Sequence, residues 1–240
     1  MDKQSIRERV WDDLEESGVA RFPFPPHGRI PNFEDADRAA IRLAETDEWE
    51  QASAIKANPD SPQRPVRRRA LADGKTVYVA VPRLRHEECF VRLDPTEIDD
   101  YDRATTIKGA PELGEQVAPD AMEHVDLIVS GSVAVTEDGA RIGKGEGYSD
   151  LEFAILRELD LVDDGTTVVT TVHERQVVED EIRPDAHDVP MDLLVTPKRV
   201  LRCDSPFERP AGIDWDVLPD EKIDAIPILQ RFRAGDRERP

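Results

Sequence analysis

The chain has 240 residues, a length that fits one large domain with a sizeable core. Charged residues make up 35% of it, hydrophobic residues 38%, and the formal net charge is -20. This acidic balance argues against a nucleic-acid-binding role, and no stretch approaches the length of a membrane-spanning helix. Apolar runs such as residues 76–81 and 167–172 are spaced like buried strands, so an acidic shell around a folded core is a better interpretation than disorder.

The basic residues and the cysteines indicate where such a protein works. Only seven of the 32 basic residues are lysines, and few lysines with excess acid are typical of a salt-adapted, halophilic protein. Cys89 and Cys203 lie far apart and outside any Cys-x-x-Cys spacing, so both are expected to be reduced. The first residues start a charged amphipathic helix rather than an apolar signal segment, which predicts a cytoplasmic protein.

In chain order, the first expected helix covers residues 2–17. Lys3 and Arg7 are four residues apart and therefore project from the same side, where they could grip a polyanion or form an ordinary charged edge. A proline-rich arm at residues 22–28 is followed by an expected helix over residues 34–45.

The next elements alternate between strand and helix. A strand over residues 52–57 runs into a rigid turn at residues 58–62, then a helix carrying Arg64, Arg67, Arg68 and Arg69, and a strand over residues 76–81. The arginine cluster is expected to be a solvated helix face rather than a nucleic-acid patch, and contact with a phosphate remains open. Residues 94–123 read as short helices at a sheet edge.

The second half continues this alternation and ends in a charged tail. Strands are expected at residues 125–129, 132–136 and 167–172, with a hairpin of residues 191–196 and 199–201 and a short helix near residues 220–223. Alternating strands and helices predict an α/β fold with a parallel or mixed sheet and helices on both faces. We expect one α/β domain over residues 1–205 and a charged extension over residues 206–240.

Three alternating glycines, Gly143, Gly145 and Gly147, lead directly into an expected helix that runs to about residue 160. Glycines let successive backbone N–H groups converge on an anion, and a helix start adds its dipole. Ser149 and Glu152 have the spacing of a capping box, with Ser149 as the N-cap. The neighbouring residues fit neither a Walker A loop nor a dinucleotide fingerprint. A phosphate loop and a simple glycine-rich connector both remain open.

Three segments together resemble the 5-formyltetrahydrofolate cyclo-ligase (5,10-methenyltetrahydrofolate synthetase) family. Residues 3–7, Lys-Gln-Ser-Ile-Arg, are similar to the N-terminal Lys-x-x-Leu-Arg helix of that family. Residues 141–150 resemble its Arg-Leu-Gly-x-Gly-x-Gly-Tyr-Tyr-Asp loop, and residues 187–192 its C-terminal His-Asp segment. Residues 29–33, 56–60 and 143–152 are similar to signatures of the methenyltetrahydrofolate synthetase domain-containing branch.

The resemblance implies a three-layer, Rossmann-like sheet and the ATP-dependent closure of 5-formyltetrahydrofolate. It implies a formylated reduced folate or related pterin as substrate, with ATP and Mg²⁺, and contact of the arginine cluster with a folate glutamate tail remains open. The acidic charge balance argues against a nucleic-acid partner, and the lack of a membrane-length apolar stretch argues against a membrane partner. Lys144 and Tyr148 would be the catalytic residues and Asp150 and Asp188 the metal ligands. The residues implied for ATP binding are Lys3, Arg7, Arg141, Gly143, Lys144, Gly145, Gly147 and Tyr148.

The sequence departs from the family pattern mainly on the expected pterin side. Residues 58–62 stand where many members have Pro-Gly-Glu, Val135-Thr136 where they have Phe-Asp, and Ser149 where they have a second tyrosine. A nucleotide-binding regulatory or RNA-associated module on the same fold is therefore the alternative function. Asp150 could also be a first-turn helix acid that interacts with the dipole, and Asp188 a turn residue.

Overall fold

A mixed eight-stranded sheet forms the centre of the computed structural model, which describes residues 2–235. In spatial order its strands are β12 (Val200–Arg202), β11 (Leu193–Val195), β10 (Thr167–Thr171), β7 (Leu127–Val129), β3 (Ala54–Ala57), β4 (Thr76–Ala80), β5 (Phe90–Leu93) and β6 (Glu115–Val117). The strands from β11 to β4 are parallel, and β12, β5 and β6 pair antiparallel at the two edges.

Helices surround this sheet, and two short hairpins lie outside it. The hairpins are β1 (Ala20–Arg21) with β2 (Asn32–Phe33), and β8 (Ala134–Val135) with β9 (Arg141–Ile142). The helices are α1 (Lys3–Glu16), α2 (Ala36–Leu43), α3 (Asp47–Gln51), α4 (Arg64–Ala72), α5 (Tyr101–Ala104), α6 (Gly109–Leu113), α7 (Tyr148–Glu158), α8 (Asp220–Ala225) and α9 (Pro227–Arg233).

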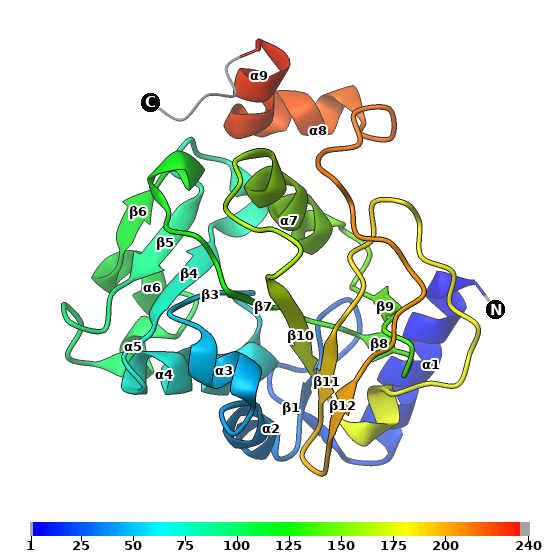
Figure 1. The fold of residues 1–240 in the computed structure, drawn as a ribbon. Helices are drawn as coiled ribbons and strands as arrows, with labels where there is room; N and C mark the ends of the chain where they lie inside the picture. Colours follow the sequence, from blue (N-terminus) through cyan, green and yellow to red (C-terminus); the bar gives the residue numbers. More distant parts are fainter. Residues whose placement is uncertain (1, 236–240) are drawn as a thin grey trace.

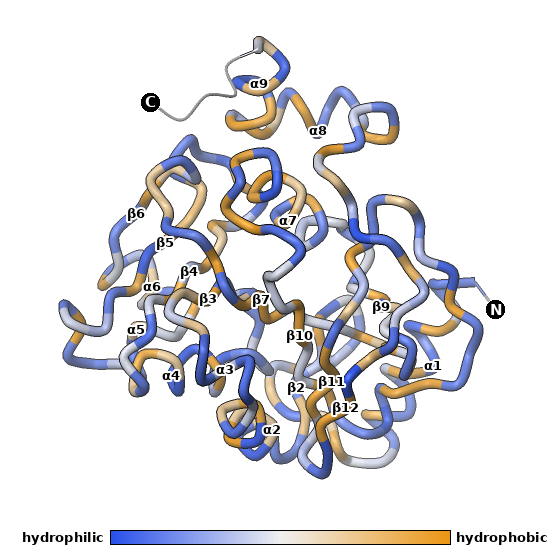
Figure 2. Tube along the Cα trace, viewed as in Figure 1, coloured by the Kyte–Doolittle hydropathy of each residue, from blue (hydrophilic) through white to orange (hydrophobic). Residues whose placement is uncertain are grey.

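The main core lies between the sheet and the helices on its two sides. Figure 1 shows α2, α3 and α4 on one side of the sheet and α7 on the other. The parallel strands are almost fully buried, as expected for strands covered on both faces. Apart from Lys56 of β3 and the threonines of β4 and β10 their residues are apolar, and hydrophobic residues follow the strands in Figure 2. The α/β fold with a parallel or mixed sheet is confirmed. Residues 94–123 do form short helices and the edge strand β6.

A second, smaller core fixes the N-terminal helix. The side chains of Ile6, Val10 and Leu14 are buried against Val133 and Ile142 of the β8–β9 region. The Asp2 side chain caps this helix by accepting from the N–H groups of residues 4 and 5. Because α1 packs on the hairpin that precedes the glycines, its first turn is held beside the glycine loop.

The segment after residue 205 folds back over α7 (Figure 1). Ile223, Ile226, Leu229 and Phe232 are buried in the main core, so α8 and α9 are anchored by apolar contacts. The domain boundary at residue 205 stays a prediction, and residues 236–240 of the expected extension lie outside the described residues. Within residues 2–235, no helix combines the length and the apolar character needed to cross a bilayer.

Candidate functional site

A cavity of about 450 Å³ opens where the carboxyl ends of neighbouring strands meet the glycine loop, residues 143–147. Residues 58–60 follow β3, residues 81–83 follow β4, and Gly131 follows β7 in its wall. The chain leaves β3 and β7 in opposite directions across the sheet, and such a switch point is the usual ligand crevice of open α/β sheets. The position of the cavity therefore follows from the topology.

The glycine loop has a backbone that only glycine adopts without strain. Gly145 and Gly147 have φ of 104° and 68°, and Gly147 is the N-cap of α7. The predicted capping box is wrong, because the helix begins at Tyr148 and the Ser149 hydroxyl donates to Asn58 Oδ1 at 3.2 Å. A left-handed glycine turns the chain into the helix here, so no side-chain cap is needed.

Helix α1 delivers one cation to this loop and a second to the neighbouring segment of residues 185–188. Arg7 Nε donates to the carbonyl oxygen of Gly143 at 2.7 Å. Its guanidinium carbon lies 3.5 Å from where a Cβ on Gly145 would stand. Lys3 lies one turn earlier and pairs with Asp188 at 2.6 Å and Asp185 at 2.7 Å. The helix spacing thus brings both predicted cations to the loop and the 185–188 segment.

Asp150 and Arg141 form a buried ion pair under the loop. Arg141 Nη2 donates to both Asp150 oxygens at 2.7 and 2.6 Å, while its Nη1 donates to the Gly131 carbonyl at 2.8 Å. Burial opposes ionisation of Asp150, but the adjacent guanidinium and the Val189 N–H outweigh it and lower the pKa of the carboxyl. Asp150 is therefore a carboxylate at neutral pH.

The two predicted metal ligands lie along the same part of the site without forming one compact group. Asp188 is adjacent to Val189, whose N–H donates to Asp150 Oδ1 at 3.1 Å. Among the described residues, the group of three or more His, Cys, Asp or Glu side chains whose ligand atoms all lie within 4.8 Å of one another is Asp185, His187 and Asp188. Asp150 is outside this group, and the role of Asp150 and Asp188 as metal ligands stays a prediction.

Lys144 and Tyr148, the predicted catalytic residues, lie at the two ends of the loop. Lys144 Nζ pairs with Glu146 at 2.7 Å and remains partly exposed. Tyr148 is the first residue of α7. The ammonium nitrogen of Lys222 lies over its ring, 4.5 Å from the ring centre. Both residues line the cavity, so they are available to a ligand that fills it.

Comparison with known proteins fits this geometry. Residues 1–197 match the sequence model of the 5-formyltetrahydrofolate cyclo-ligase family. The chain belongs to this family. Methenyltetrahydrofolate synthase domain-containing proteins from Mus musculus and Homo sapiens are 42% and 38% identical over 98% of the chain. The chain spans 64% and 62% of their lengths.

A solved structure supports the fold of this cyclo-ligase family member independently. The structure of Aquifex aeolicus 5,10-methenyltetrahydrofolate synthetase superposes with a TM-score of 0.54 at 23% identity, covering 87% of this chain and 96% of that one. The family match and the relatives confirm the resemblance that the three motifs indicate, and this solved structure confirms the fold.

Two polar residues of the cavity wall, Asn58 and Glu152, belong to a buried polar network. Its residues lie in the segments 56–60 and 143–152 that resemble the branch signatures, but the motifs do not reveal how they pair. Lys56 of β3 and Glu152 of α7 form an ion pair in which both side chains are more than nine-tenths buried. Asn58 donates to Glu152 at 3.3 Å and accepts from the Gly131 N–H at 2.9 Å. A lysine inside a buried strand is the signal that could have indicated this pair, because a buried ammonium group needs a partner.

The predicted solvated arginine face is wrong for Arg67, while Arg64, Arg68 and Arg69 are half-exposed. Arg67 is 3% exposed and donates to carbonyl oxygens of residues 58–60 and 105. It shapes the turn after β3, which carries Asp60 into the cavity wall. Burial raises the pKa of Asp60, opposed by the nearby Lys144 and Arg67.

Of the segments expected on the pterin side, residues 58–62 and Val135-Thr136, only part lines the cavity. Residues 58–60 line the cavity together with the glycine loop. Val135 and Thr136 lie on the β8–β9 hairpin and, within the described part of the chain, are not among the residues around this cavity. Arg83, on the segment after β4, does line it and lies 3.8 Å from Glu146.

Proposed function

We propose that this chain binds ATP with Mg²⁺ at the glycine loop and closes 5-formyltetrahydrofolate to 5,10-methenyltetrahydrofolate. The observation that carries the proposal is a run of backbone N–H groups in the glycine loop that is available to a ligand and has cationic side chains beside it. In the part of the chain that the structure describes, no hydrogen bond uses the N–H groups of residues 144–147. Such a run of donors at a helix start favours phosphate.

Three cations would complete the phosphate site. Lys3 and Arg7 approach from α1, and Lys144 belongs to the loop itself. A nucleoside triphosphate carries several negative charges, and phosphoryl transfer asks a protein mainly for positioning and charge neutralisation. Lys144 would contact the transferred phosphoryl group, and Tyr148 would cover the substrate.

Asp150 and Asp188 fit Mg²⁺ by their chemistry. Mg²⁺ prefers oxygen ligands and commonly takes one or two carboxylates together with phosphate oxygens. Each carboxylate retains acceptor sites beyond those used by Arg141 and Lys3. When bound, Mg²⁺ would neutralise charge that develops on the phosphate oxygens. The protein's own part is to keep both carboxylates ionised and oriented.

The chemistry explains why ATP is required. The formyl oxygen of 5-formyltetrahydrofolate is a poor leaving group, so it first takes the terminal phosphoryl group of ATP and ADP departs. The folate N10 then adds to the formyl carbon and loses its proton, and the former formyl oxygen leaves as phosphate. The cavity must therefore hold the pterin and the phosphate chain side by side. Residues 58–60 and the glycine loop offer two walls for this.

The deciding experiment is an absorbance assay. Purified protein, Mg²⁺-ATP and 5-formyltetrahydrofolate are followed for the near-ultraviolet band of the methenyl product, with samples lacking ATP or Mg²⁺ as blanks. We expect a signal that needs both. A folded protein that binds Mg²⁺-ATP but forms no product would overturn the ligase and leave the nucleotide-binding module.

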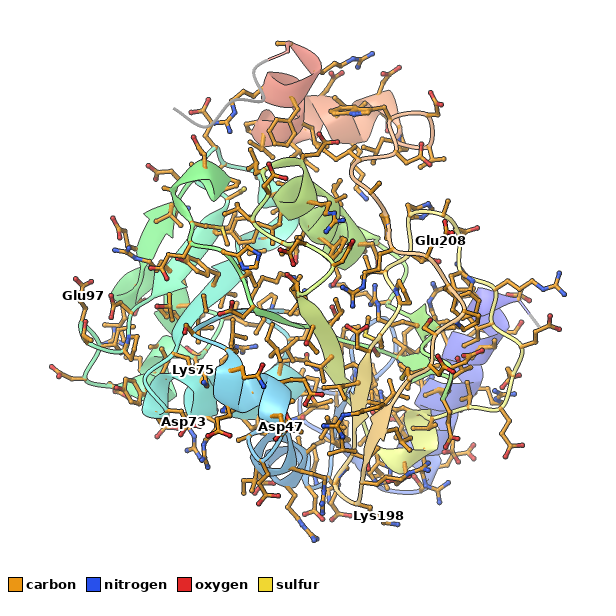
Figure 3. The ribbon with its side chains drawn as sticks, viewed as in Figure 1. Asp47, Asp73, Lys75, Glu97, Lys198 and Glu208 are labelled. Atoms are coloured by element: carbon orange, nitrogen blue, oxygen red, sulfur yellow. The ribbon has the colours of Figure 1, made fainter. Side chains whose placement is uncertain are left out.

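A matched pair of lysine variants tests the phosphate site. Lys144→Met removes a loop cation, whereas Lys198→Met removes a lysine from the β11–β12 turn, which Figure 3 shows far from α7 and α8. We expect Lys144→Met to lower kcat/KM for ATP by about tenfold or more. Lys198→Met should behave like the wild type. Equal effects of the two would contradict a local role.

A further inference from the structure

Lys222 on α8 reaches the glycine loop from outside the cavity. Its Nζ donates to the carbonyl oxygen of Glu146 at 2.9 Å and lies 4.5 Å from the centre of the Tyr148 ring. A Cβ on Gly147 would stand 3.6 Å from the same nitrogen. The family match ends at residue 197, so this contact comes from a part of the chain beyond it.

The hydrogen bond from Lys222 to the Glu146 carbonyl also sets the direction of the Gly147 N–H, because the two groups belong to one trans peptide. The carbonyl of residue 146 and the N–H of residue 147 lie in one rigid peptide plane and point in opposite directions within it. By holding the Glu146 carbonyl toward α8, Lys222 turns the Gly147 N–H away from α8. Since Gly147 lines the cavity, its N–H is kept as one of the unused donors of the loop.

Arg7 makes the corresponding contact at the other end of the loop. It holds the Gly143 carbonyl, and this orients the N–H of Lys144 in the same way. Two cations, one from each end of the chain, therefore fix two peptide planes of the same loop. Glycine peptides are the most freely rotating ones, so such fixation replaces order that the residues themselves do not supply.

Lys222 is delivered by a rigid support. Ile223 follows Lys222 on α8, and Ile226 follows the end of that helix. Their side chains are 4% and 0% exposed and belong to the main core. Partial burial lowers the pKa of the Lys222 ammonium group, while the nearby Asp150 and Glu146 oppose this shift. A partly desolvated ammonium group forms stronger hydrogen bonds than one in water.

We propose that Lys222 is a positioning residue of the nucleotide site, through which the C-terminal segment orders the glycine loop for phosphate. The inference rests on the proposed ATP-binding function. Lys222 acts through the Glu146–Gly147 peptide and the Tyr148 ring, and needs no contact with the nucleotide.

The first test measures the order of the loop without nucleotide. Nitrogen-15 relaxation of the Gly147 N–H is compared in the wild-type chain, Lys222→Met, Lys222→Arg and the control Lys198→Met. In Lys222→Met we expect the order parameter of this N–H to fall from about 0.85 to about 0.6 or lower. Lys222→Arg retains a donor and a charge and should preserve the order, as should Lys198→Met.

The second test measures Mg²⁺-ATP affinity of the same four proteins by calorimetry. We expect affinity about tenfold weaker in Lys222→Met, restored by Lys222→Arg, with an unchanged melting temperature. An unchanged order parameter at Gly147 in Lys222→Met overturns the inference, and so does a mobile Gly147 with wild-type ATP affinity. If the wild type binds no ATP, the proposed function fails, and the relaxation data still decide whether Lys222 orders the loop.

Discussion

Arg141 and Asp150 face each other across 2.6 Å with side-chain exposures of 5% and 9%, so each neutralises a charge that the other would leave buried. This relationship changes what removal of Asp150 does. The carboxylate, predicted from the family loop as a metal ligand, also stabilises the fold. A loss of activity in a variant at this position is informative only if folding is measured as well.

We expect Asp150→Asn to lower the free energy of unfolding by about 3–5 kcal/mol, because Arg141 keeps its buried charge and loses its partner. The measurement is denaturant unfolding followed by circular dichroism. The double variant Arg141→Met/Asp150→Leu, which removes both charges, should be more stable than the single one. A cost below about 1 kcal/mol for Asp150→Asn would contradict a stabilising pair.

The same pair predicts a defined acid dependence. The folded-state pKa of Asp150 lies below its ordinary 3.8, so its contribution to stability is complete above about pH 5 and is lost as pH falls through the folded pKa. The stability difference between wild type and Asp150→Asn should be constant from neutral pH to about pH 5 and shrink below it. Unfolding curves at several pH values test this, and a difference that grows toward acid would refute it.

Arg67 and Arg68 offer a matched comparison on α4. Arg67 is buried with several carbonyl acceptors, and burial lowers its pKa only to about 10, so it stays charged at neutral pH. Arg67→Met should cost at least about 2 kcal/mol, because those carbonyls lose their donor. Arg68 pairs with the exposed Asp102 at 3.1 Å, and Arg68→Met should cost less than about 1 kcal/mol. Similar costs for the two would disprove the structural role of Arg67.

The net charge of -20 predicts stabilisation by salt. Repulsion between surface carboxylates is screened as the Debye length falls from about 10 Å at 0.1 M to about 3 Å at 1 M. The melting temperature should therefore rise over this range of sodium chloride. A flat or falling melting temperature would exclude the salt-adapted interpretation.

Much of the fold could be predicted from local patterns, because apolar runs such as residues 125–129 mark strands buried on both faces. The helix cap could not be predicted in this way. Ser149 has the spacing of an N-cap, but its hydroxyl donates to Asn58, which is 91 positions away in the chain. Arg67 was misassigned for the same reason: its carbonyl partners belong to turns that the helix pattern does not reveal.

Within the candidate site, short motifs predicted which residues take part, whereas the contacts between them depend on long-range packing that the motifs do not reveal. The spacing of Lys3 and Arg7 predicted a shared face, which the structure places at the glycine loop and the 185–188 segment. The contact from Lys222 spans 76 positions to Glu146, and no periodicity within either segment indicates it.

The pairing of β3 with β7 has a consequence for how ligands act on this molecule. The two strands are neighbours in the sheet although more than sixty positions of chain separate Ala57 from Leu127, so the cavity between their ends exists only after the whole sheet has assembled. The unfolded chain has no such cavity, and any compound that fills it shifts the global unfolding equilibrium by mass action. A screen of nucleotides and reduced folates by thermal shift would therefore rank candidate ligands before any reaction is assayed.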